Sequence, residues 1–410
     1  MTNQKPMDES KKLKMTISEL FYLQCPIPHW DTRFANVIVS LYLLLNENEA
    51  VYRQYQAQPD HELKRQLLTE FQADRSVKIE ISSMLDHKLK QLLSAITEIG
   101  SPDELIEGLQ TCYQEFAPMD GEFKTKNLVN LLATMARRIL EEPSKITDKY
   151  NEDHSPDTTN STSDKLLFIP CAGFGDLGYE IGWTNTLSYE GYHLTHELGT
   201  KLARLKQFTS QYHNRYCLYR PLETTVNADL IILTLDNAVP ISNRQLQTLQ
   251  QANFRIDAIP ASCDTVSNWI QLGLFHLNPT GKILVSSNTS WLSDRKSQKL
   301  RQYLVQQNLI ETIMVLPRTF NRDARQRKII MILNKNKAVN RQNHIGFLDA
   351  FELTMSQKHL GANQCLPTSR IETLINLVLV HESPNDLVTK VSLDQILAIK
   401  CNLNPKRYIA

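Results

Sequence analysis

Apolar residues recur with a helical period over the first 145 residues of the chain. The segments Phe34–Leu45, 50–96 and Asn127–Leu140 place Leu, Ile, Val and Met three and four positions apart, with Glu, Lys and Gln between them. The most apolar of them, Phe34–Leu45, is shorter than the roughly 20 residues of a membrane span, so it predicts a buried helix. The period as a whole predicts an all-α N-terminal domain over residues 1–145.

A polar stretch follows, and after it the period changes. Residues 146–164 are rich in Ser, Thr, Asp and Asn and nearly lack large apolar side chains, which predicts a polar linker or mobile loop. From residue 165 onward, short β-branched runs alternate with helix-like segments. We expect strands within 165–173, 185–194, 215–221, 228–236, 281–287, 310–317 and 327–337, and helices within 195–208, 264–277 and 293–308.

Uniformly apolar strands that alternate with helices are typical of a sheet covered on both faces. We therefore predict an α/β fold over residues 165–410, with a doubly wound, mostly parallel sheet preceded by the helical domain. In such folds, ligands bind at the carboxyl ends of the strands, where the winding reverses.

Composition narrows the functional classes. The chain is 41% hydrophobic and 22% charged with a formal net charge of +1, which favours an ordinary soluble protein over a strongly basic nucleic-acid binder. None of the seven cysteines has Cys-x-x-Cys spacing, and the histidines join no ligand cluster, so no metal site is expected. The N-terminus lacks a signal-peptide pattern, so we expect a cytoplasmic protein with reduced thiols and no membrane contact.

Glycines gather directly after the first expected strand, in "FIPCAGFGDLG" (168–178), where they would let the backbone close around a nucleotide. The segment resembles the first motif of adenine DNA methyltransferases, Asp-Pro-Ala-Cys-Gly-Ser-Gly, with Pro170, Gly173 and Gly175 on the pattern. Phe174 replaces a small residue between the glycines. Ile169 stands where the family has the aspartate.

Further segments are similar to type I restriction–modification M subunits in the same order. Gly121, Glu122, Phe123 and Thr125 match a Gly-Glu-Phe-Tyr-Thr-Pro segment that helps to enclose the cofactor in that family. Residues 277–320, "RKIIMILNKNK", "IGFLDAFEL" and "CNLNPKRYIA" continue the similarity to the end of the chain. The resemblance spans roughly Ser101–Ala410 and implies a class I methyltransferase-like fold. It places S-adenosylmethionine on Pro170, Gly173, Phe174, Gly175, Glu122, Phe123 and Thr125, as a vestigial or weak pocket.

The motif that carries the chemistry is altered. "ADLIILTLDN" aligns with the family's Phe-Asp-Val-Val-Leu-Ala-Asn-Pro-Pro-Phe, which puts Thr234, Leu235, Asp236 and Asn237 in place of Asn-Pro-Pro-Phe. In the family, the asparagine and a proline carbonyl accept hydrogen bonds from the amine of a flipped adenine, and the ring stacks on the base. Threonine cannot reach as an amide does, and no ring remains. We therefore expect no catalytic residues, and S-adenosylmethionine either to be absent or to bind without turnover.

Five cations lie close together in "LPRTFNRDARQRKII". They are Arg318, Arg322, Arg325, Arg327 and Lys328. Such a cluster could bind nucleic-acid phosphates, because backbone contacts dominate that affinity. The alternative is a solvated loop whose charge is tempered by Asp323.

The hypothesis from sequence is a catalytically degenerate methyltransferase-fold protein. It would bind or scaffold within a DNA modification, restriction or defence assembly. Its expected partner is a protein, either a methyltransferase or another modification or defence subunit, with DNA reached through that partner or the basic loop. The alternatives are a diverged but active S-adenosylmethionine-dependent DNA adenine methyltransferase, using Thr234, Asp236 or Asn237, and a nucleoside-sensing module.

Overall fold

The computed structural model divides into two compact units. One contains Met1–Phe123, Gly173–Gly175 and Tyr192–Ser210, and the other contains Lys124–Ala172, Asp176–Gly191 and Gln211–Ala410. The structure describes residues 32–47, 58–72, 75–97, 126–142, 165–170, 176–183, 185–188, 226–235, 264–317, 327–350, 367–379 and 387–409, with residues 99, 105, 256, 259 and 320.

The described part of the first unit is helical, as the period predicts. It consists of α2 (Thr32–Glu47), α4 (Asp60–Glu70), α5 (Arg75–Ser83) and α6 (Asp86–Thr97). In α6, Leu89, Leu92, Leu93 and Ile96 are buried at helical spacing, so one stripe of the helix enters the core. Lys90 pairs with Asp60 at 2.8 Å and joins α6 to the start of α4.

No helix in the described ranges combines the length and apolar character that crossing a bilayer requires. The apolar segment Phe34–Leu45 lies within α2. From Val37 to Leu41 its residues are buried, as the sequence predicts for a core helix.

In the second unit, the described strands form one eight-stranded sheet in the order β2-β1-β3-β4-β6-β5-β7-β8. The strands are β1 (Leu167–Ile169), β2 (Thr186–Ser188), β3 (Ala228–Thr234), β4 (Leu277–Asn288), β5 (Ile310–Val315), β6 (Lys328–Asn334), β7 (His344–Asp349) and β8 (Thr389–Ser392). Six of these eight strands run one way; β6 and β8 run the other. The predicted mostly parallel α/β sheet is confirmed.

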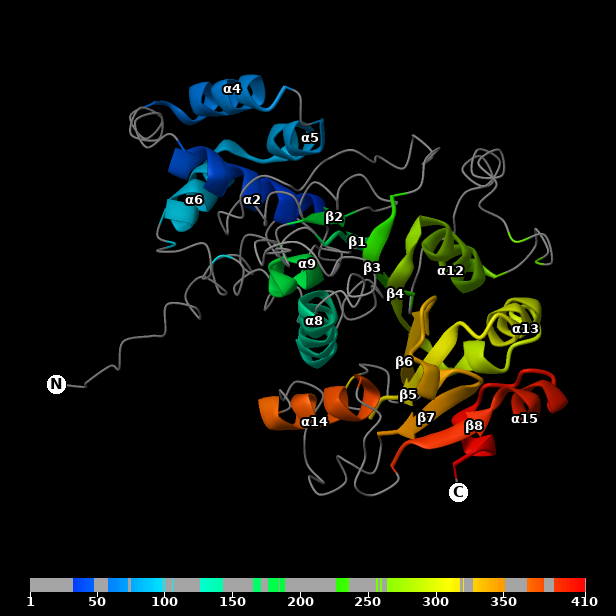
Figure 1. The fold of residues 1–410 in the computed structure, drawn as a ribbon. Coiled ribbons are helices and arrows are strands. Elements are labelled where there is room, and N and C mark those ends of the chain that lie inside the picture. The colour runs from blue at the N-terminus through cyan, green and yellow to red at the C-terminus, as the bar shows by residue number, and fades with distance from the viewer. Residues whose placement is uncertain are drawn as a thin grey trace, which may run out of the picture. The chain divides into compact units, whose positions relative to one another are not determined.

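Helices cover both faces of this sheet (Figure 1). Ile231 and Leu233 of β3 pack into a cluster with α12 (Thr265–His276), α13 (Gln298–Gln306) and α15 (Leu393–Ala398). Leu230 and Ile232 pack into the opposite cluster with α8 (Lys126–Glu141), α9 (Asp176–Ile181) and α14 (Thr368–Leu379). Successive residues of a strand point to opposite faces, so an uninterrupted apolar strand serves two cores.

Helix α8 belongs to the α/β unit, although the sequence places it in the helical domain. Its buried Leu131, Leu132 and Met135 join the cluster that contains β1 and β3. Arg138 pairs with Glu372 of α14 at 2.5 Å, and Arg137 donates to the carbonyl of Glu180 at the end of α9. The compact unit that contains α8 begins at Lys124, whereas the sequence predicts a linker at 146–164. An amphipathic pattern shows that a helix buries one face, but not against which element.

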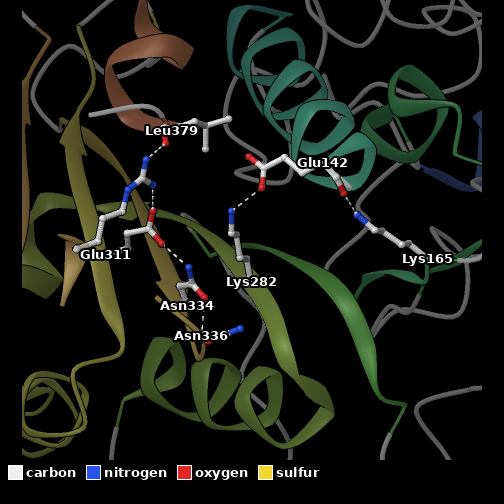
Figure 2. Close-up of polar contacts among 8 residues, drawn as sticks. Glu142, Lys165, Lys282, Glu311, Asn334, Asn336 and Leu379 are labelled. Carbon is white, nitrogen blue, oxygen red and sulfur yellow. Dashed lines mark hydrogen bonds and ion pairs between the residues drawn. The ribbon is translucent and has the colours of Figure 1, made fainter. Parts of the chain in front are cut away.

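Polar side chains tie the helices to the amino edge of the sheet, where the parallel strands begin (Figure 2). Beyond the end of α8, Glu142 accepts from Lys282 of β4 at 3.0 Å, and its backbone carbonyl accepts from Lys165, just before β1. On β5, Glu311 is buried and accepts from Asn334 and Arg341. The same arginine donates to the carbonyl of Leu379 at the end of α14.

The C-terminal segment is held by a buried arginine and a stacked tyrosine. Arg301 of α13 is 2% exposed and donates to the carbonyls of Cys401 (3.0 Å) and Trp291 (2.6 Å). Tyr408 stacks on Phe347 with ring centroids 4.5 Å apart, and burial raises its pKa to about 12. The "CNLNPKRYIA" segment thus has a packing role in this fold.

One buried histidine makes the fold sensitive to acid. His276 at the end of α12 is fully buried, and its Nδ1 accepts from the backbone N–H of Val226 at 3.2 Å. Burial lowers its pKa from 6.5 to about 4. The folded state therefore favours the neutral ring, and the resulting stability is complete above pH 6.5 and is lost as the pH falls towards 4.

We expect the unfolding free energy to drop by about 2 kcal/mol between pH 7.5 and pH 5.0 because of this residue. His276→Asn keeps an acceptor near Nδ1 and cannot titrate, so that part of the drop should vanish. Urea unfolding at the two pH values measures it. An equal drop in wild type and variant would contradict the assignment.

Candidate functional site

The strand ends at the carboxyl edge of the sheet form the candidate site. Register places the ends of β1 and β2 side by side, with Ile169 opposite Ser188. Thr234 at the end of β3 lies opposite Ser286 of β4, and Asn288 at the end of β4 lies opposite Lys328, where the antiparallel β6 begins. This is the edge at which ligands bind in doubly wound sheets.

The end of β3 is built into the sheet and the core. The backbone N–H of Leu235 donates to the carbonyl of Ser286 at 2.7 Å, so the ladder between β3 and β4 continues past Thr234. The Leu235 side chain is 3% exposed and packs in the cluster that contains α12 and α13. Thr234 is partly exposed. The two remaining positions of the motif, Asp236 and Asn237, lie outside the described residues.

The start of α12 contributes a carboxylate to this edge, because the helix follows β3 and returns along the sheet. Asp264 caps the helix: its Oδ1 accepts from the N–H of Ser267 at 3.0 Å. Its Oδ2 accepts from the hydroxyls of Ser267 (2.6 Å) and Ser297 (2.9 Å). The carboxylate thus caps the start of α12 and also bonds Ser297 at the start of α13.

A second carboxylate at this edge is paired with an arginine of the predicted basic cluster. Asp349 ends β7, and both of its oxygens accept from Arg327, Oδ2 at 3.1 Å and Oδ1 at 2.5 Å. The pair crosses the end of β5, which lies between β6 and β7. Lys328 is 6% exposed. The other three cations of the cluster, Arg318, Arg322 and Arg325, lie outside the described residues.

The cofactor residues expected from the resemblance are described in part. Pro170 is buried directly after β1. Gly173, Phe174, Gly175, Glu122, Phe123 and Thr125 lie outside the described residues. The strand-end residues that the structure does describe here, Ile169, Pro170 and Ser188, include no acidic residue, so they supply no charged ligand for the ribose of a nucleoside.

The described residues contain no cluster of three histidine, cysteine or carboxylate side chains that could hold a metal ion. Sequence reasoning missed Asp264 and Asp349 at this edge. The first has a recognisable signal, because an aspartate directly before a helical segment is a typical N-cap. The partner of the second is 22 residues away in the chain, and no local pattern reveals such a pairing.

One glycine supports the resemblance from the structural side. A Cβ on Gly281 of β4 would lie 2.6 Å from Leu277 Cδ1 and 2.9 Å from the carbonyl oxygen of Ala228. Only glycine fits this close approach between β3 and β4 without a shift of the backbone. The position falls in residues 277–320, which are similar to the M subunits.

Comparison with known proteins agrees with this geometry. Residues 210–410 match the family model of the N-6 DNA methylases. A methylase subunit of the type I restriction enzyme MjaVII from Methanocaldococcus jannaschii is 28% identical over 144 residues. That alignment covers 34% of this chain and 24% of the relative, so the chain matches about a quarter of the curated protein.

Solved structures share the fold at low identity. The methyltransferase subunit of a type I restriction–modification system from Streptococcus thermophilus superposes with a TM-score of 0.67 and 15% identity, covering 98% of this chain and 100% of that one. A chain from a type I restriction–modification system, solved to explain complex assembly and conformational transition, gives 0.65 and 12%, covering 99% and 93%. The predicted resemblance is confirmed: residues 210–410 match the N-6 DNA methylase family model, and the chain shares the fold of the type I methyltransferase subunits.

Proposed function

We propose that this chain is a methyltransferase-fold protein that does not transfer methyl groups and acts as a binding or scaffolding subunit in a DNA modification, restriction or defence assembly. The hydrogen bond from the Leu235 N–H to the Ser286 carbonyl is the observation that carries the proposal. The resemblance has a proline at this position, and proline has no N–H to donate. Here the strand end is part of the sheet ladder.

The side chains at the same place support the loss of chemistry. Thr234 offers a short hydroxyl where the resemblance has an amide, and the Leu235 side chain is committed to the core. Loss of one preorganised hydrogen-bonding group in an active site commonly costs about 3–4 kcal/mol of transition-state stabilisation. The altered amide, prolines and aromatic ring together would remove the methyl-transfer rate.

The two carboxylates described at this edge also act within the protein. Asp264 caps α12 and Asp349 pairs with Arg327. A binding or scaffolding role does not require S-adenosylmethionine, and any residual binding of this cofactor would occur without methyl transfer. The named relatives are subunits of restriction–modification systems, which favours a protein partner for this chain, with DNA reached through that partner or the basic cluster.

The test combines cofactor binding and methyl transfer. Calorimetry with S-adenosylmethionine is run beside transfer of a labelled methyl group to adenine-containing duplex DNA, with an active adenine methyltransferase as the positive control. We expect no transfer above background, in the wild type or in Thr234→Ala.

Transfer by the wild type that Thr234→Ala, Asp236→Ala or Asn237→Ala abolishes would contradict the proposal and establish a diverged active methyltransferase. Cofactor binding without transfer would identify a nucleoside-binding module. Complete absence of both would direct the search to the partner protein, by co-purification with methyltransferase and specificity subunits.

A further inference from the structure

The Arg327–Asp349 pair sits where the basic cluster meets the sheet. Strands β5 and β6 are antiparallel neighbours, with Val315 opposite Ile329, so the connection 316–327 joins them at the carboxyl edge. The N–H of Leu316 donates to the carbonyl of Lys328 at 2.8 Å, and Phe320 is fully buried. Arg327 is thus the last residue of a connection that carries most of the cluster's charge.

Asp349 engages this arginine through both terminal nitrogens. The two guanidinium nitrogens lie 3.1 Å and 2.5 Å from the two carboxylate oxygens. This is the bidentate geometry that guanidinium groups also use to bind phosphate. The two side chains are 22% and 26% exposed, so the pair is partly buried and only weakly screened by salt. A phosphate would have to displace the carboxylate to reach the same nitrogens.

We infer that Asp349 is an internal competitor for nucleic-acid phosphate: it holds Arg327 on the sheet and withholds one cation of the basic cluster from DNA. Lys328, the neighbouring cation of the cluster, is buried as well. This inference rests on the proposed DNA contact of the subunit, and it does not depend on whether methyl transfer is lost.

The experiment measures affinity for a short mixed-sequence DNA duplex as a function of salt, using the full chain and four variants. Asp349→Asn removes the competing charge and keeps the shape of the side chain. Arg327→Gln breaks the same pair from the other side, and the third variant combines both changes. Glu142→Gln is the matched control, because it removes the same charge from a lysine pair at the opposite edge of the sheet.

We expect Asp349→Asn to bind DNA more tightly and its salt slope to steepen by about one, which adds roughly a threefold loss of affinity between 50 and 200 mM salt. The double variant and Glu142→Gln should match the wild type, and Arg327→Gln should show no gain because it leaves the Asp349 carboxylate uncompensated. Binding by Asp349→Asn alone, with none by the wild type, also supports the inference.

Three results would overturn it: weaker binding by the double variant, an equal gain from Glu142→Gln, or no gain from Asp349→Asn, including no binding by any variant. Thermal unfolding of Asp349→Asn and Arg327→Gln measures the stability lost with the ion pair, which both variants lack. Only Asp349→Asn also releases the arginine, so a gain in DNA affinity that is confined to this variant does not come from the loss of stability. The methyl-transfer assay reports separately on the proposed function.

Discussion

A chain truncated to residues 146–410 should fail to fold, whereas residues 124–410 should form a stable α/β unit. The shorter chain lacks α8, whose large apolar residues lie in the core against β1 and β3: Leu128, Val129, Leu131, Leu132, Met135, Ile139 and Leu140. Burial of each such side chain contributes about 1.5–3 kcal/mol. Their sum exceeds about 10 kcal/mol, which is comparable with the whole stability of a domain.

Soluble yield, far-ultraviolet circular dichroism and urea unfolding of the two truncated chains measure this effect. The full chain serves as the reference for the unfolding of the α/β unit. Equal cooperative unfolding by both truncated chains would show that α8 contributes nothing essential to this core and would return the boundary to the polar segment 146–164.

Replacement of Glu311 by alanine should lower the unfolding free energy by about 3 kcal/mol. The side chain of Glu311 is 1% exposed and that of Arg341 is 18% exposed, so the substitution leaves a largely buried cation without its carboxylate. Asn334 loses its acceptor as well, and Arg341 keeps only its bond to the Leu379 carbonyl at the end of α14 among the contacts drawn (Figure 2).

Glu372→Ala is the matched control, because it breaks the Arg138–Glu372 pair at side-chain exposures of 41% and 35%. Exposed pairs contribute less than about 1 kcal/mol, so its effect should be small. Equal losses from the two alanine variants would contradict the special role of the buried pair. Glu311→Met combined with Arg341→Met should recover part of the loss, since an apolar pair leaves no buried charge.

The same carboxylate gives a pH signature. Burial raises the pKa of Glu311, but the hydrogen bond from Asn334 and the charges of Lys282 and Arg341 lower it by more, so the net shift is downward. A lowered folded-state pKa stabilises the protein above the unfolded value of 4.5, and this stability is lost as the pH falls through the folded value. The acid response of Glu311 should therefore begin below that of His276.

Local pattern was enough to predict most elements of the α/β unit. The apolar runs that predict β3, β4, β5 and β6 serve both faces of the sheet, so each reads as a continuous hydrophobic segment. Strand β8 (Thr389–Ser392) escaped prediction, because it is short and only Val391 and its neighbour before the strand, Val388, are buried. A strand of this kind is defined by its pairing with β7 rather than by its own residues.

Charged residues were harder to place than apolar ones. Arg301 has the surroundings of a surface helix in the sequence, yet it is almost fully buried on two backbone carbonyls. Arg327 was predicted as a candidate DNA contact, and its carboxylate partner is on another strand. The sequence shows the charge of such a residue, but the residue that neutralises it depends on the tertiary fold. At the candidate site, the similarity to the family motif identified Thr234 and Leu235. The hydrogen bond from the Leu235 N–H to the Ser286 carbonyl is visible only in the structure.

The contact between Lys165 and the Glu142 carbonyl has a consequence for how this gene can change. It holds the end of α8 beside the start of β1, so Glu142 and Lys165, which flank residues 143–164 in the sequence, are in contact. Closing a longer chain between fixed ends costs only about 0.6 kcal/mol for each doubling of its length. Insertions can therefore accumulate there during evolution with little penalty, and an experimenter can graft a fluorescent reporter at the same place.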